Sequence, residues 1–139
     1  EWTAVAKSWH GPGEPNVSEG HSSNQMILGG RFLGYQWKGN MGPMEFQGIG
    51  ALGYDNFKKE YQAIWMDSMS SSIYYTAGQA SEDGKTITLK GTWESPMGKL
   101  PNRMVYELLG PDSYRITSYT NMGRGELKDM ELTFTRVKK

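Results

Sequence analysis

Five side chains in the central part of the sequence could meet to bind a small molecule: Arg31, Tyr35, Trp37, Trp65 and Asp67. Arg31, Tyr35 and Trp37 are separated by even numbers of residues, so they would share one face of a β-strand. Trp65 and Asp67 would share a face of a second strand for the same reason. If both faces point into one interior, a guanidinium, a phenol, indoles and a carboxylate converge there. A few polar groups set among apolar side chains are typical of a ligand-binding site.

The same residues allow two other interpretations. In a structural one, Arg31 and Asp67 pair with each other or bond a turn, while Tyr35 and Trp65 belong to the core. In an enzymatic one, Arg31 anchors a carboxylate of the substrate, and Tyr35 or Asp67 moves a proton. An open cavity lined by Trp65 and Tyr35 would favour binding. A filled core would favour an interaction domain, and a cavity carboxyl or phenol with a strongly shifted pKa would favour catalysis.

The elements that must position these side chains are short alternating runs separated by turn residues. Their spacing predicts about ten strands, at residues 1–9, 17–28, 31–38, 44–54, 59–67, 73–79, 86–93, 103–109, 114–120 and 126–137. Residues 57–69 also match helical spacing. A strand is expected there because aromatic residues dominate the segment and turn residues bound it on both sides.

About ten antiparallel strands must hide their edges, and closure into a barrel does so completely. A barrel of this strand number can enclose a cavity of ligand size. Glycines 48, 50 and 53 lie inside one predicted strand, where they would mark a bulge, a bend or a close approach of backbone. The sequence therefore predicts an all-β fold, with residues 1–139 forming one domain, a single antiparallel β-barrel.

Residues 26–33, 46–56 and 65–70, together with the ending at 130–136, carry a family resemblance. In these segments the chain resembles a bacterial family known as domain of unknown function 1579, and the likeness extends in order over nearly the whole chain. The resemblance implies a lipocalin-like, calycin-type β-barrel and no established activity. Because many members look exported, it also favours a periplasmic or secreted location over a cytoplasmic one.

The composition excludes several other classes of protein. The 15 Lys and Arg residues balance 15 Asp and Glu residues, so the basic excess of a nucleic-acid binder is missing. There is no cysteine, which excludes disulfides, thiolate nucleophiles and cysteine zinc sites. His10 and His21 have no third ligand at motif spacing, so neither a metal nor a cofactor is predicted. No apolar run approaches the roughly 20 residues of a membrane-spanning helix.

These observations favour a non-enzymatic barrel that binds a small apolar or amphipathic molecule in its cavity. The first alternative is a barrel enzyme of the lyase or isomerase kind, using Tyr35, Arg31 and Asp67. The second is an interaction or structural domain with a filled core. The sequence does not define the ligand or the oligomeric state, for which a homodimer is one option.

Overall fold

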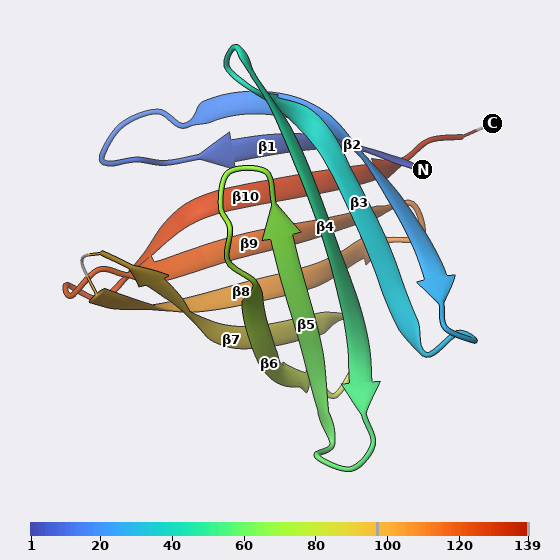
Figure 1. Cartoon of the computed structure of the whole chain (residues 1–139). Coiled ribbons are helices and arrows are strands. Elements are labelled where there is room, and N and C mark those ends of the chain that lie inside the picture. Colours follow the sequence, from blue (N-terminus) through green and yellow to red (C-terminus); the bar gives the residue numbers. More distant parts are fainter. Residues whose placement is uncertain (97, 139) are drawn as a thin grey trace.

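Ten β-strands make up the regular structure of residues 1–96 and 98–138, the part of the chain that the computed structural model describes (Figure 1). The strands are β1 (Trp2–Ser8), β2 (Asn16–Ile27), β3 (Phe32–Met41), β4 (Met44–Asp55), β5 (Glu60–Asp67), β6 (Tyr74–Ala80), β7 (Thr86–Ser95), β8 (Gly98–Gly110), β9 (Ser113–Asn121) and β10 (Glu126–Arg136). All ten predicted strands are present, and residues 60–67 of the ambiguous segment form β5. No described segment forms a helix of the length and apolarity that a membrane crossing requires.

The strands form one closed antiparallel barrel, as predicted. Each strand pairs with its neighbours in the sequence, and β1 also pairs with β10, from Trp2 opposite Arg136 to Ser8 opposite Met130. Both termini therefore lie at the same end of the barrel (Figure 1). Closure gives every strand two partners, so the sheet has no free edge. The interior of the barrel is thus separated from its outer surface.

Strand β8 begins earlier than the predicted residue 103, because β7 continues far enough to provide partners for the residues before it. Thr92 lies opposite Pro101 and Trp93 lies opposite Leu100. Proline cannot donate a hydrogen bond to a neighbouring strand, so Pro101 weakens the strand pattern before residue 103. The extension lengthens the wall of the barrel at the end opposite the two termini.

Only a few inward side chains are fully buried. Leu89 has no exposed surface, while Ala4, Ala63 and Phe134 are each no more than 5% exposed. Ala6 and Gly50 also occupy inward positions, where they fill little of the interior. The barrel is therefore partly hollow, as a barrel with this many strands permits.

Candidate ligand-binding cavity

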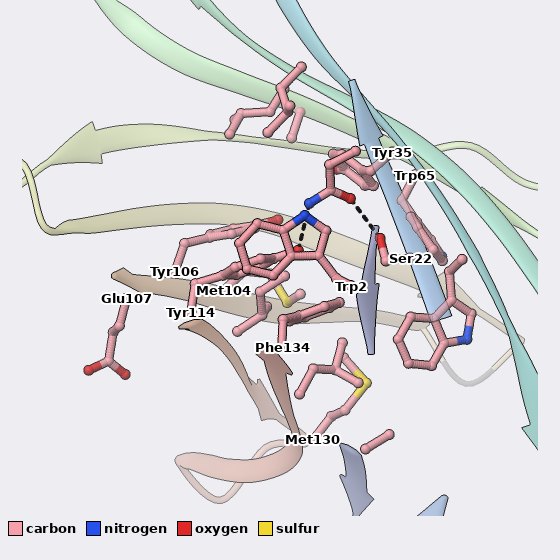
Figure 2. Close-up of a pocket in the computed structure, with 18 of the residues that line it drawn as sticks. Trp2, Ser22, Tyr35, Trp65, Met104, Tyr106, Glu107, Tyr114, Met130 and Phe134 are labelled. Carbon is pink, nitrogen blue, oxygen red and sulfur yellow. Dashed lines mark hydrogen bonds between the residues drawn. The ribbon is translucent and has the colours of Figure 1, made fainter. Parts of the chain in front are cut away.

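A cavity of about 1310 Å³ occupies the interior of the barrel and opens to solvent. This volume exceeds the 300–1,000 Å³ that is common for small-molecule sites. The wall is mainly apolar and aromatic, and Figure 2 shows Trp2, Tyr106, Tyr114 and Phe134 grouped around part of it. The size and lining are those of a binding cavity rather than of a filled core.

One row of inward positions crosses five neighbouring strands and forms one side of the cavity. The pairing of β2 to β6 places Asn24 opposite Tyr35, Tyr35 opposite Gly50, Gly50 opposite Trp65, and Trp65 opposite Tyr74. The rings of Tyr35 and Trp65 lie parallel across Gly50, with centroids 6.0 Å apart and an interplanar angle of 19°. The predicted convergence of Tyr35 and Trp65 is therefore present in the structure.

Glycines in β4 make room for these rings. A Cβ atom at Gly50 would lie 2.4 Å from Cε2 of Tyr35, and one at Gly48 would lie 2.2 Å from Cζ2 of Trp65. Such distances are far shorter than ordinary carbon contacts. The close approach of backbone that the sequence allowed is present at Gly50, where a Cβ atom would also lie 2.6 Å from the Ile64 carbonyl oxygen. At Gly48 the group that approaches is the Trp65 ring.

Replacing Gly48 with alanine is expected to displace the Trp65 indole from the wall. We expect a loss of about 2 kcal/mol in the free energy of unfolding, the typical cost of forcing an extra methyl group into a packed site. Urea denaturation followed by circular dichroism measures this loss, and tryptophan emission reports the altered environment of the indole. Gly110 has open space around it, so Gly110→Ala is the matched control. Equal stability of the two variants would contradict the proposed contact.

Asp67 holds the Trp65 indole in place. The Trp65 Nε1–H group donates to Oδ2 of Asp67 at 2.7 Å, and the backbone N–H of Met69 donates to Oδ1 at 3.0 Å. Both carboxylate oxygens therefore already accept a hydrogen bond. Asp67 lines the cavity as predicted, but its contacts are those of a residue that positions a neighbouring ring.

Arg31 does not reach the cavity, which corrects the expected convergence. The β2–β3 ladder ends at the Ile27–Phe32 pair, so Arg31 belongs to the connecting turn and is exposed. The sequence suggested a shorter turn at Gly29–Gly30 with a strand beginning at Arg31. Leu28 and both glycines have positive φ values, and this backbone conformation prolongs the turn. Arg31 and Asp67 consequently form no ion pair.

Trp37, two residues along β3 from Tyr35, belongs to a second aromatic group in the cavity wall. Its ring meets Phe134 edge-on at 5.9 Å, and Phe134 stacks on Tyr114 at 4.3 Å. Trp2 in turn meets Tyr114 edge-on at 4.9 Å. Aromatic rings from β1, β3, β9 and β10 therefore form a continuous apolar surface in the cavity wall.

The polar spot consists of Ser22, Asn24 and Tyr114. The Ser22 hydroxyl donates to Oδ1 of Asn24 at 2.7 Å, and Nδ2 of Asn24 donates to the Tyr114 hydroxyl oxygen at 2.9 Å, as the dashed lines in Figure 2 mark. Tyr35 lies across the strand pair from Asn24, and its hydroxyl interacts with that of Tyr106. Hydroxyl and amide groups from four strands thus gather inside an otherwise apolar cavity.

Burial keeps the cavity phenols neutral. It raises the pKa of Tyr35 to about 12, an effect that Tyr106 partly opposes. It also raises the pKa of Tyr106 well above the ordinary value. Burial raises the pKa of Tyr114 as well, against the opposing effect of Asn24 and Ser22. A phenol with a raised pKa keeps its proton at neutral pH and serves as a hydrogen-bond donor.

A further tyrosine is fixed within a buried hydrogen-bond network. The Tyr74 hydroxyl donates to Oδ1 of Asn102 at 2.5 Å, and Nδ2 of Asn102 donates to Ser118 and Thr120 at 2.9 and 3.0 Å. Burial, and then the charge of Asp129, raises the pKa of Tyr74. Its ring stacks on Trp93 at 3.7 Å. This network anchors the cavity wall and uses the hydrogen-bonding capacity of Tyr74 internally.

Charged groups at the cavity lie near its ends. Lys85 precedes β7 and Arg136 ends β10, at the end of the barrel that holds the termini. His10 lines the opposite end. Within residues 1–96 and 98–138, no group of three or more His, Cys, Asp or Glu side chains is arranged to hold a metal ion.

Several lining residues were not selected from the sequence, among them Trp2, Ser22, Asn24, Tyr106 and Tyr114. Alternation would have placed Tyr106 on an inward face, since its strand has the apolar residues Met104 and Leu108 on the same side. No such signal exists for Ser22 and Asn24, because polar residues in a polar strand are expected to face solvent. Their inward position depends on which face of β2 turns toward the interior when the barrel closes.

A closed antiparallel barrel around an open aromatic cavity defines this molecule as a lipocalin-like β-barrel. Within that class, the chain belongs to the family described as "Protein of unknown function (DUF1579)", whose model matches residues 1–136. The resemblance noted in the sequence is thereby confirmed.

No curated protein matches the chain. Among solved structures, an S-type phycobiliprotein lyase, CPES from Guillardia theta, is similar, with a TM-score of 0.58 and 14% sequence identity. The match covers 99% of this chain and 87% of that chain. At this level of identity the likeness concerns the fold alone.

Proposed function

We propose that this protein binds a small, largely apolar or amphipathic molecule inside its barrel. The observation that carries the proposal is the open cavity of about 1310 Å³ with Tyr35 and Trp65 in its wall. An apolar cavity with a few placed polar groups is the usual form of a small-molecule site. Burying apolar ligand surface contributes roughly 25 cal/mol per Å² of binding free energy before the costs of association are subtracted.

An enzymatic role is the main alternative, and the similar solved structure is itself named as a lyase. The predicted acid–base set is not assembled in this chain. Arg31 lies in a turn, both oxygens of Asp67 accept hydrogen bonds, and the pKa of Tyr35 is moved away from neutrality to about 12. General acid–base catalysis works best with a pKa near the working pH. These contacts favour binding over catalysis.

Fluorescence titration with N-phenyl-naphthylamine, an uncharged apolar dye, tests the proposal directly. We expect saturable binding by the wild-type protein, and an affinity about tenfold lower for Trp65→Ala, which removes a large aromatic contact. Trp9 does not line the cavity, since its ring lies beneath the Lys128 ammonium at 5.0 Å. Trp9→Ala is therefore the matched control. Absence of saturable binding, or equal loss in the two variants, would reject the proposal.

Native mass spectrometry of freshly purified protein then identifies the ligand class. We expect a non-covalent adduct above the 15.6 kDa chain, released when the collision energy is raised. The mass of the released molecule would name the compound, and the Trp65→Ala variant should retain less of it than Trp9→Ala does.

A further inference from the structure

We propose that the cavity recognises an uncharged carbonyl oxygen on an otherwise apolar ligand, through donors supplied by Tyr114, Asn24 and Tyr35. The inference rests on the proposed function and specifies the chemical class of the ligand. It is carried by the donors that remain available in the polar spot and by the position of the nearest charges.

The hydrogen-bond protons of the polar spot are only partly used within it. The Ser22 proton goes to Asn24, and one of the two Asn24 amide protons goes to the Tyr114 oxygen. Tyr114 thus accepts a hydrogen bond there, and its O–H group, which also neighbours the Ser22 hydroxyl, can rotate toward a ligand in the cavity. Asn24 keeps a second N–H group, since a carboxamide carries two. The spot therefore holds two groups that can donate to a ligand, the Asn24 amide and the Tyr114 hydroxyl.

The neighbouring phenols add a further donor. Tyr35 lies opposite Asn24 across β2 and β3, and its hydroxyl interacts with that of Tyr106. A hydrogen bond between two phenols uses one of their two protons, so one O–H group remains for a third partner. The raised pKa of both groups keeps these protons in place at neutral pH. An oxygen atom with two lone pairs is the natural complement of this set.

Three charged residues line this end of the cavity, Lys85, Glu107 and Arg136, and the contacts of Arg136 argue that the oxygen is uncharged. The Arg136 guanidinium lies on the ring of Trp2, 4.4 Å from its centroid, while Tyr114 meets that ring edge-on. Arg136 is also paired with Asp112, with Nε and Oδ1 3.1 Å apart. Its charge is therefore partly neutralised by Asp112. A carboxylate buried without a cation loses hydration that hydroxyl donors replace only in part.

The walls around the polar spot specify the rest of the ligand. Trp2, Phe134 and the Tyr114 ring pack against one another beside it, and the stacked Tyr35 and Trp65 rings extend from it across β3 to β5. Flat apolar groups fit between such rings better than bulky polar ones. The ligand class is therefore a flat, uncharged, carbonyl-bearing apolar molecule.

Three related naphthalene probes test this inference by fluorescence titration: prodan, which carries a ketone, its propyl analogue without the oxygen, and the matching naphthalene carboxylate. We expect the wild-type protein to bind the ketone about tenfold more tightly than the propyl analogue, the range of one or two well-made hydrogen bonds. The carboxylate should bind more weakly than the ketone. In Tyr114→Phe, the preference for the ketone should fall to about threefold or less.

Tyr54→Phe is the control, since Tyr54 is 46% exposed and does not line the cavity. Equal binding of ketone and propyl analogue, a preference for the carboxylate, or an unchanged ketone preference in Tyr114→Phe would each overturn the inference while leaving the proposed function standing. Binding of none of the probes would overturn both. If Tyr114→Phe loses its circular dichroism signal, Tyr35→Phe takes its place with the same expected loss.

Discussion

Replacing Gly78 with alanine is expected to lower the free energy of unfolding by about 3 kcal/mol, the upper part of the range for overpacked sites. A Cβ atom at Gly78 would lie 1.9 Å from the carbonyl oxygen of Thr88 and 3.1 Å from Cα of Leu89. Both atoms belong to the backbone of β7, so no side-chain rotation relieves the clash. Relief requires β6 and β7 to separate next to Leu89, the fully buried side chain.

Guanidinium denaturation followed by circular dichroism measures this loss, and a fall of about 10 °C in Tm should accompany it. Gly11→Ala is the control, because nothing lies within 4 Å of a Cβ atom at Gly11, and its effect should stay within about 0.5 kcal/mol. The clash at Gly78 would be refuted if the two variants unfolded at the same denaturant concentration.

Most of the strand pattern could be predicted from the sequence because strands and turns are local features. The alternation of apolar and polar residues in β3, β7 and β10 follows from the period of two in a strand. The Asp83–Gly84 hairpin has its glycine at positive φ, as a tight turn requires. Closure could be inferred as well, since a long antiparallel meander would otherwise expose two edges.

The candidate site was less predictable, because it depends on small shifts in where strands begin and on which face turns inward. A longer β2–β3 turn removed Arg31 from the predicted set. Ser22 and Asn24 were not recognised, since the hydroxyl and amide that make the polar spot look like solvent-facing groups in a sequence. Trp65 and Asp67 were correctly brought to the cavity, but their mutual hydrogen bond was not foreseen.

Cavity shape and side-chain chemistry are linked through the glycines of β4. Gly48 and Gly50 allow Trp65 and Tyr35 to lie against the wall, and this leaves space inside the barrel. The hydroxyl of Tyr35 interacts with that of Tyr106, and Asn24 lies opposite Tyr35 on the neighbouring strand β2. The glycines thus determine both the volume of the cavity and the position of its polar groups.

Stability is expected to fall steeply as pH rises from about 10 to about 12, because phenols inside the barrel hold their protons more tightly than in the unfolded chain. The ordinary pKa of tyrosine is about 10, whereas burial raises the pKa of Tyr35 to about 12. Below pH 10 both states are protonated and the full stabilisation is present. Above it the unfolded state releases the proton first, so unfolding becomes more favourable until the folded phenol also ionises.

Tyr35 alone should contribute a loss on the order of 2–3 kcal/mol across this interval, since each pKa unit corresponds to about 1.4 kcal/mol. Urea denaturation at a series of pH values gives the slope of stability against pH, and tyrosinate absorbance follows the ionisation itself. Tyr35→Phe should show a shallower slope than the wild-type protein, while Tyr54→Phe, which alters an exposed tyrosine, should match the wild type. Identical slopes in all three proteins would contradict the raised pKa of Tyr35 and its burial in the folded barrel.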